Sequence, residues 1–202
     1  MFHFYEPAKG HGLPHNPLKA LVSPRPIAWV SSLSADGTPN LAPYSFFNAV
    51  NEDPPIVIIS CSTAPDRAEK DTLANIVATR EFVVHIVPQA LGEAMNISSA
   101  PHPAEIDEFE AAGLAKAPST LVAPPRIADA PVAMECRYHL SQKMPGSAGY
   151  TVVFGEVVGI HIAEAVLENG LVNVEKYAPL SRLGYMDYAA VKETFSMKRP
   201  TA

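Results

Sequence analysis

The chain has 202 residues, of which 48% are hydrophobic and 18% are charged, and its formal net charge is −6 at pH 7. These values exclude a largely disordered chain and predict one soluble domain with a sizeable core. The sequence has no basic stripe interleaved with aromatic residues and no window with the roughly 20 apolar residues of a membrane span, so neither nucleic acid nor membrane is an expected partner.

Residues 1–20 predict an N-terminal extension rather than a targeting signal. The opening MFHFYEPAKG has neither a basic leader nor a long apolar stretch, so we expect a cytoplasmic protein. His3, His11 and His15 are close in sequence but have no cysteine or acidic partner at metal-ligand spacing. This pattern favours a loose terminus over a metal site.

The next segments predict a β-hairpin. Residues 27–33 read as a strand, residues 35–40 (ADGTPN) supply Asp-Gly turn chemistry, and a second strand follows as NLAPYSFFN at residues 40–48. That second strand mixes apolar side chains with Ser45 and Asn48, and its proline cannot donate to a sheet ladder. We therefore expect one side of this strand to face something other than protein.

A strand and a helix follow, and polar groups lie between them. The β-branched run IVIISCS at residues 56–62 predicts a strand buried on both faces, and residues 70–80 predict a short amphipathic helix capped by Asp71. The groups that could gather between them to bind a phosphate are Ser60, Ser62, Thr63, Arg67, Lys70 and Thr72. From these residues alone a capped helix beside a polar turn is the better interpretation, because Asp71 would repel an anion.

The remaining segments predict a mainly β fold with peripheral helices. Residues 82–87 form another strand pattern, residues 89–97 predict a second helix, and Gly113 ends a third. Residues 132–140 alternate like a half-exposed antiparallel strand, and a long strand at residues 151–162 carries two glycines that mark bulges. Because βαβ alternation is absent, the pattern favours an antiparallel barrel in a single domain, residues 1–202. The C-terminal segment from about residue 171 is apolar enough to pack on the barrel or on a second subunit.

The sequence has no dinucleotide fingerprint, no phosphate-binding P-loop and no nucleophile elbow. His85 and His161 lie in apolar strands, where a satisfied core or edge histidine is the commoner outcome, and His161 is the better candidate for an acid, base or ligand. Cys61 and Cys136 have no neighbouring base and no secretory context, so packed free thiols are favoured over a nucleophile or a disulfide.

Several motifs, in their order and spacing, resemble those of the flavin reductase-like, FMN-binding split-barrel family. They fall within residues 22–184 and read PRPIAWVSS, NLAPYSFFNAV, DPPIVIIS, KDTLANI, EFVVHIV, PPRIADAPVAMEC and FGEVVGIHI. The resemblance implies a Greek-key split β-barrel, a homodimer, and one FMN per subunit near the dimer interface.

The resemblance also implies a cofactor site. The residues that would contact the edge of the isoalloxazine ring are Tyr44, Ser45, Phe46, Phe47 and Asn48. Those that would line the phosphate are Ser60, Ser62, Lys70, Asp71 and Thr72. Residues 24–29 would support the ring, His161 would lie near the pocket, and RLGY at residues 182–185, with Arg182 as a contact, would close over it. Many relatives carry a glycine where this chain has Tyr185.

The implied activity is NAD(P)H-dependent flavin reduction. Hydride would pass from NADH or NADPH to flavin N5, and reduced flavin or electrons would then reach a flavin-dependent monooxygenase or a redox protein. Because the cofactor carries this chemistry, the missing catalytic dyad is compatible with it. The same motifs permit two alternatives, a flavoredoxin-like electron carrier with tightly bound FMN and no nicotinamide site, and a non-catalytic flavin-binding barrel.

Overall fold

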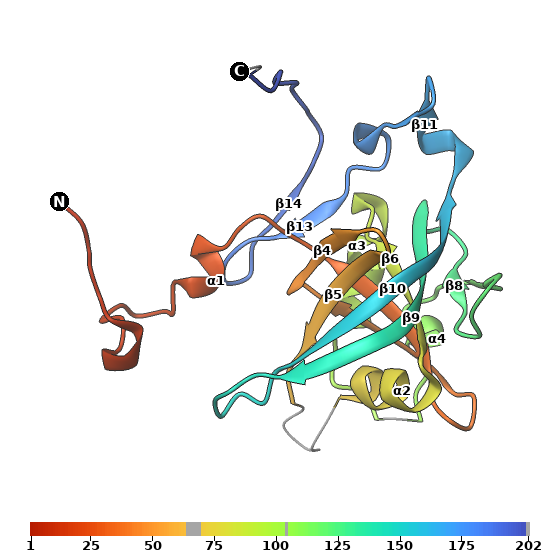
Figure 1. Cartoon of the computed structure of the whole chain (residues 1–202), viewed down its shortest axis with the longest axis horizontal. Helices are drawn as coiled ribbons and strands as arrows, with labels where there is room; N and C mark the ends of the chain where they lie inside the picture. The colour runs from red at the N-terminus through yellow and green to blue at the C-terminus, as the bar shows by residue number, and fades with distance from the viewer. Residues whose placement is uncertain (64–69, 104, 201–202) are drawn as a thin grey trace.

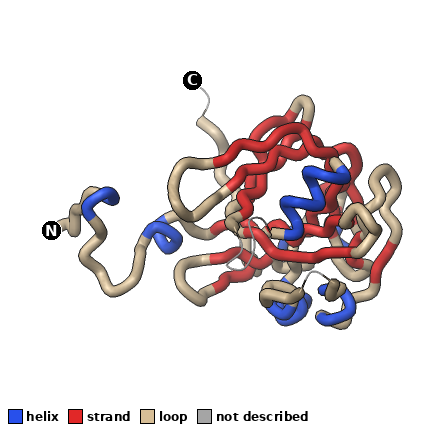
Figure 2. Tube along the Cα trace, turned by 90° about the horizontal axis from the view of Figure 1, so that it is seen from below, coloured by secondary structure: helices blue, strands red, loops and turns tan. Residues whose placement is uncertain are grey.

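A seven-stranded antiparallel sheet dominates the computed structural model, which describes residues 1–63, 70–103 and 105–200 (Figure 1). Its strands in spatial order are β3 (Pro39–Tyr44), β2 (Ala28–Leu33), β6 (Glu81–Ile86), β9 (Val132–Lys143), β10 (Thr151–Ile162), β5 (Pro55–Cys61) and β4 (Phe47–Glu52). Seen from below, the sheet curls into a ring, and α2 (Asp71–Thr79) covers one end of it (Figure 2). The predicted mainly β barrel with peripheral helices is confirmed.

The barrel is split where the chain passes from β3 to β4. These two strands are consecutive in sequence, yet they lie at opposite edges of the sheet. The prediction of one continuous strand over residues 40–48 is therefore wrong, because the chain bends at Ser45 and Phe46 to leave one edge and enter the other. A hydrogen bond of 2.9 Å from the Ser60 amide to the Phe46 carbonyl ties this bend to the end of β5.

Two apolar clusters lie on opposite faces of β2. Ala28 and Val30 point into the barrel with Phe82, whereas Trp29 points outward into a second cluster. The Trp29 indole donates a 2.9 Å hydrogen bond to the Ser98 hydroxyl, so this large buried side chain satisfies its polar atom. Inside the barrel a Cβ on Gly155 would lie 2.2 Å from the Phe82 ring, so the close approach there requires glycine.

The helices are short, and they differ in part from the predicted ones. The α-helices besides α2 are α1 (Leu18–Leu21), α3 (Gly92–Ile97) and α4 (Glu108–Ala111), and the 3₁₀ helices are η1 (Pro7–Lys9), η2 (Gln89–Leu91), η3 (Glu164–Val166) and η4 (Val174–Lys176). The predicted helix over residues 89–97 is thus η2 followed by α3. Asp71 is the first residue of α2 rather than its cap, and Lys70 occupies the cap position.

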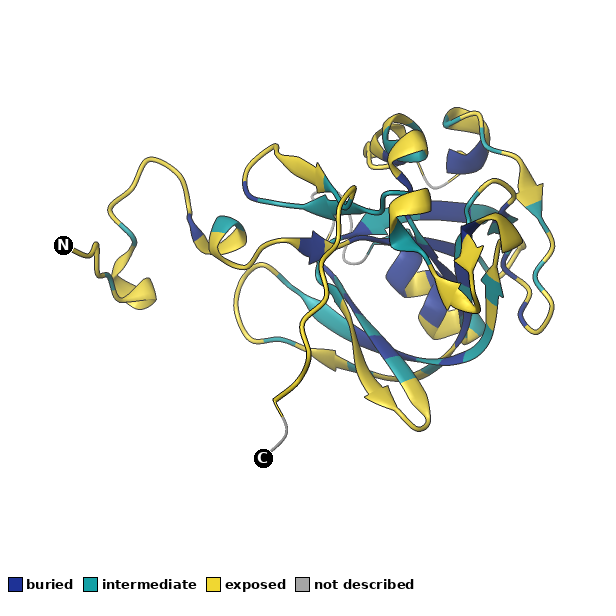
Figure 3. Ribbon diagram, turned by 90° about the horizontal axis from the view of Figure 1, so that it is seen from above, coloured by how far each residue is buried: buried dark blue, intermediate teal, exposed yellow. Residues whose placement is uncertain are grey.

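Both ends of the chain leave the barrel. The N-terminal segment projects away from it, and Phe2 and Phe4 are 98% and 83% exposed (Figure 3). The C-terminal segment first packs back, because β13 (Leu180–Arg182) lies between β1 (Arg25–Pro26) and β14 (Tyr188–Ala190) in a small sheet. Two further strand pairs are β7 (Lys116–Ala117) with β8 (Arg126–Ile127), and β11 (Leu167–Glu168) with β12 (Leu171–Val172). In the described part of the chain no helix has the length and apolarity to cross a membrane.

Two strand predictions need correction. Residues 56–62 were expected to be buried on both faces, but only Val57, Ile59 and Cys61 of β5 are buried, and the opposite face, with Ile58 and Ser60, is only half-buried. In β9 the expected exposed face is interrupted by Glu135, which is fully buried. The β10 bulges are confirmed, because the β9–β10 register shifts at both predicted glycines.

His85 is a satisfied core histidine. It is fully buried, its Nδ1 lies 2.9 Å from the Trp29 carbonyl, and its Nε2 accepts a hydrogen bond from the Ile127 amide. An acceptor role for Nε2 assigns the ring proton to Nδ1, so the ring is neutral and links β2 to β8. Burial lowers the pKa of His85 from 6.5 to about 4.

This pKa predicts an acid-sensitive fold. Between pH 6.5 and about 4 the unfolded chain binds a proton that the folded chain excludes, so the stabilisation is complete above pH 6.5 and is lost as the pH falls. Between pH 7 and pH 4 the free energy of unfolding should fall in both proteins. We expect the fall in His85→Gln to be smaller than the fall in the wild-type protein, by up to about 3 kcal/mol. Urea unfolding at several pH values measures the difference, and parallel losses in the two proteins would contradict the assignment.

Candidate functional site

Three cavities meet around residues 43–48, where the barrel is split. We name them after one lining residue each: the Phe46 cavity, the Lys70 cavity and the Arg182 cavity. Ser45 lines both the Phe46 and the Arg182 cavities, and Pro43 lines both the Lys70 and the Arg182 cavities. The end of β3 thus lines the Lys70 and Arg182 cavities, and the bend that follows it lines the Phe46 and Arg182 cavities.

The Phe46 cavity has a volume of about 420 Å³ and a largely apolar wall. Its lining residues are Leu18, Lys19, Val22, Pro24, Arg25, Pro26, Ser45, Phe46, Phe47, Asn48, Ile58 and Ser60. They come from α1, β1, the bend, β4 and the half-buried face of β5. This cavity explains why one face of β5 is only half-buried. Ile58 and Ser60 line the cavity and do not pack in the barrel core.

The ring of Phe46 has one aromatic and two cationic neighbours. It stacks on Tyr150, with ring centroids 5.6 Å apart, and the charged ends of Lys19 and Arg25 lie 5.8 and 5.9 Å from its centroid. An aromatic wall with cations beside it suits a planar ligand that carries or acquires negative charge. The predicted ring contacts Ser45, Phe46, Phe47 and Asn48 all line this cavity.

The Lys70 cavity is smaller, about 160 Å³, and more polar. Its lining residues are Asn40, Ala42, Pro43, Tyr44, Lys70, Asp71, Thr72, Ser98, Ser99, Ala100, Pro101, His102 and Glu108. The Lys70 ammonium lies 5.6 Å from the centre of the Tyr44 ring, directly before the first residues of α2. The N-terminus of this helix, a lysine and several hydroxyls surround one small space and would favour a phosphate, whereas the carboxyls of Asp71 and Glu108 in the same lining would oppose one.

A hydrogen-bond network supports the floor of the Lys70 cavity. The Asn40 amide donates to Thr72 Oγ1 at 2.8 Å and to Ser32 Oγ at 3.3 Å, and the Asn75 amide donates to the same Ser32 oxygen at 3.2 Å. Glu108 accepts a 2.9 Å hydrogen bond from the Leu41 amide, and burial raises the pKa of this carboxyl. Thr72 thus positions α2 against β3, and Asn75 positions it against β2.

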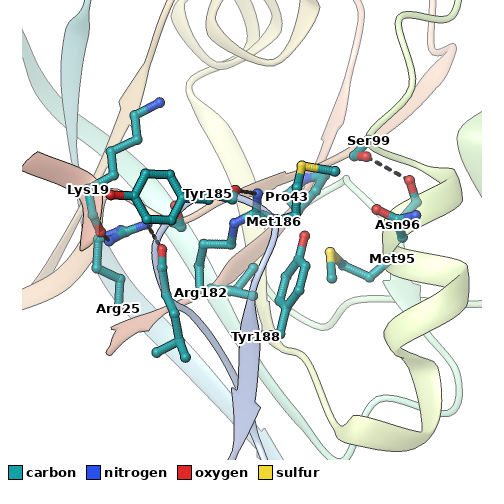
Figure 4. Close-up of a pocket in the computed structure, with 13 residues that line it drawn as sticks. Lys19, Arg25, Pro43, Met95, Asn96, Ser99, Arg182, Tyr185, Met186 and Tyr188 are labelled. Carbon is teal, nitrogen blue, oxygen red and sulfur yellow. Dashed lines mark hydrogen bonds between the residues drawn. The ribbon is translucent and has the colours of Figure 1, made fainter. Parts of the chain in front are cut away.

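The Arg182 cavity has a volume of about 380 Å³ and lies between α3 and the segment from β13 to β14 (Figure 4). It is lined by Lys19, Arg25, Ile27, Pro43, Ser45, Met95, Asn96, Ser99, Arg182, Leu183, Tyr185, Met186 and Tyr188. Arg25 is 6% exposed, and its guanidinium donates to the backbone carbonyls of Lys19, Val22 and Leu183. This one side chain ties α1 to the C-terminal segment.

The structure brings most of the predicted site residues to these cavities. Lys70, Asp71 and Thr72 line the Lys70 cavity, and Arg182 lines the cavity named after it. Two residues lie in the cavity other than the expected one: Tyr44, a predicted ring contact, lines the Lys70 cavity, and Ser60, a predicted phosphate contact, lines the Phe46 cavity. Ser62 is half-buried just beyond β5 and lines none of the three. Arg67 lies outside the described residues.

His161 does not line any of these three cavities. Its Nε2 bonds Glu135 Oε1, and the same carboxylate accepts hydrogen bonds from the amides of Thr120 and Leu121. Burial raises the pKa of Glu135, but these hydrogen bonds outweigh it and hold the pKa below its ordinary value. In the β9–β10 ladder His161 is opposite Ala133, two residues from Glu135, so the ladder directs it to this buried carboxylate. The interaction gives His161 a structural role.

Sequence reasoning missed Lys19, Tyr150 and Tyr188 as site residues. Tyr150 reaches Phe46 from the turn between β9 and β10, about a hundred positions along the chain, and Tyr188 enters the Arg182 cavity from β14. No local pattern marks either contact. The position of Lys19, close to the motif at residues 24–29, could have indicated a site residue. The N-terminal region around it, however, has the composition of an unstructured extension.

The chain is similar in sequence to known proteins. A model of the flavin reductase-like domain matches residues 21–181. An uncharacterised protein of Aquifex aeolicus is 45% identical over 165 residues, which cover 81% of this chain and 83% of the relative.

Two solved structures are also similar. Nitrilotriacetate monooxygenase component B from Bacillus cereus superposes with a TM-score of 0.84 at 32% identity, covering 92% of this chain and 98% of the other. The 2-nitrobenzoate 2-nitroreductase of Pseudomonas fluorescens superposes with a TM-score of 0.80 at 36% identity, covering 91% of this chain and 89% of the other.

Both cysteines are buried free thiols, as the sequence predicts. Burial raises the pKa of Cys61 to about 12 and raises that of Cys136 as well. We expect iodoacetamide to leave both thiols unmodified in the native protein at pH 8 and to alkylate both in urea, because the thiolate is the reactive form. Mass spectrometry of the intact protein reads the result. Rapid alkylation of native Cys61 would show instead that it is an accessible nucleophile.

Proposed function

The chain belongs to the flavin reductase-like family, and from this premise we propose that it is an FMN-binding oxidoreductase that uses NADH or NADPH. Reduced flavin or its electrons would pass to a partner, and a flavin-dependent monooxygenase is the leading class because one similar chain is component B of a nitrilotriacetate monooxygenase. The observation that carries the proposal is the Phe46 cavity, an aromatic and cationic pocket at the bend that follows β3.

The residues present fit FMN. The Phe46 cavity has the volume of a small-molecule site and offers the half-buried Ile58 and the ring of Phe46 as apolar walls. Asn48 and Ser60 supply polar atoms along its edge. In the Lys70 cavity, Lys70 offers a cation and Thr72 a hydroxyl for a phosphate, beside the N-terminus of α2. The aromatic pocket would hold the ring of this cofactor and the Lys70 cavity, at the end of β3, its phosphate.

Each part of the chain has a defined task in this proposal. When bound, FMN supplies the capacity to accept hydride and release electrons. Phe46 and Ile58 would orient a planar group and exclude water from one side of it. Lys19 and Arg25 would favour negative charge on that group, because they place two cations at the same wall. Lys70 would hold the phosphate and thereby fix the position of the ring.

We further propose that the protein is a cytoplasmic homodimer. The family resemblance motivates the dimer.

Anaerobic reduction tests the proposed activity. Mixing the purified protein with FMN and NADH or NADPH should bleach the flavin absorbance catalytically, at a rate that increases with protein concentration. Boiled protein and FMN with nicotinamide alone are the controls. Absence of bleaching with both nicotinamides would reject the reductase, and reduction by a redox protein alone would identify an electron carrier.

Substitution of Lys70 tests the phosphate site. We expect Lys70→Ala to weaken FMN binding about 10-fold or more and to leave riboflavin binding nearly unchanged, because only FMN carries the phosphate that the lysine would pair with. Flavin fluorescence quenching measures both affinities. Lys192→Ala, which removes a cation from an exposed position, is the matched control. Equal losses for the two flavins would show that Lys70 does not bind phosphate.

A further inference from the structure

The Arg182 cavity concentrates positive charge. Arg25 and Arg182 are direct partners in the β1–β13 ladder, and Lys19 lines the same space. Burial and then the charge of Arg182 lower the pKa of Arg25, as expected for two guanidinium groups held close together. Like charges at opposed strand positions are destabilising unless something neutralises them.

The described part of the chain does not neutralise this charge. No aspartate or glutamate lines the cavity, and among the described residues Lys19, Arg25 and Arg182 form no ion pair. An anion in this cavity would therefore relieve the repulsion between the two arginines and gain from all three cations.

The cationic side chains differ in how many of their N–H groups already donate hydrogen bonds within the protein. Arg25 is committed to three backbone carbonyls, so it is a fixed part of the wall. Arg182 donates one hydrogen bond, to the Tyr185 carbonyl, and lies over the Tyr188 ring at 4.4 Å. A guanidinium carries five N–H donors in a planar fork that fits a carboxylate. Arg182 and Lys19 thus keep donors available for a ligand.

The rest of the cavity is suited to a planar apolar body. Tyr188 and Met95 lie to one side of Arg182, and Tyr185 and Arg25 lie to the other (Figure 4). Tyr185 is 53% exposed and Met186 is 82% exposed, so these two apolar side chains form an open rim that a ligand could cover. A small inorganic anion would satisfy the charges but would leave this rim uncovered.

We propose that the Arg182 cavity binds a small aromatic carboxylate, with the carboxylate on Arg182 and Lys19 and the ring between the tyrosine and methionine side chains. This inference rests on the proposed function, because it places the ligand beside the same flavin centre. Ser45, Lys19 and Arg25 line both this cavity and the Phe46 cavity, so a ring bound here is next to the proposed flavin position.

Calorimetry with benzoate and benzamide tests the charge requirement. The two probes have nearly the same shape and differ in charge, and neither needs to react. In the purified protein, with and without FMN, we expect benzoate to bind at least 10-fold more tightly than benzamide and to bind more weakly as salt increases. Similar affinities for the two probes would overturn the proposal. Because binding is also measured without flavin, a failure of flavin reduction leaves this result readable.

Substitutions of Arg182 test the assignment to this cavity. Arg182→Gln should weaken benzoate about 10-fold, and Arg182→Lys should retain part of the affinity because it keeps the charge without the fork. Arg126→Gln on β8 is the matched control, since it removes one positive charge at a residue that lines none of the three cavities. Thermal unfolding of each variant verifies that it folds.

Three results would refute the assignment. Unchanged benzoate binding in Arg182→Gln would place the ligand elsewhere. An equal loss of FMN binding in the same variant would make Arg182 a flavin contact instead. Displacement of benzoate by NADH, with weaker NADH binding in the variant, would assign the cavity to the nicotinamide donor.

Discussion

The bend at Ser45 and Phe46 is the constraint on which the rest of the site depends. The sheet cannot close there, because β3 pairs only with β2 and β4 pairs only with β5 at the two ends of the strand order. The single backbone hydrogen bond from Ser60 to Phe46 holds the bend against β5. Side chains around this opening, which would pack inside a closed barrel, instead line the three cavities.

Buried polar groups keep the frame around the opening rigid. His85 links β2 to β8, Glu135 holds the amides that precede β8, and Asn40 joins β3 to α2. Each of these groups is buried and hydrogen-bonded, so moving one element would leave a polar atom without a partner. This rigidity suits the proposed site, in which a ring and a phosphate would be held at a fixed separation.

Positively charged side chains line all three cavities. The chain as a whole carries a net charge of −6, yet Lys19, Arg25, Lys70 and Arg182 all lie around the bend. A local positive field on an acidic protein attracts anionic ligands to one place on its surface. The aromatic wall of the Phe46 cavity then selects a planar ligand, and the N-terminus of α2 favours a phosphate.

The sequence by itself determined the mainly β fold with peripheral helices, the hairpin of β2 and β3, the glycine bulges of β10 and the buried thiols. These features depend on near neighbours in the chain, on side-chain alternation and on the backbone freedom of glycine. The family motifs also marked the residues of the bend and of the N-terminus of α2.

Tertiary structure alone decided which faces are covered. It decided that Ile58 lines a cavity, that Glu135 is buried, and that His161 turns to that carboxylate. It also brought Tyr150 to Phe46 and Arg182 to Arg25 from distant parts of the chain. Burial and charge neighbours depend on contacts between residues far apart in sequence, and no local pattern specifies which of them will meet.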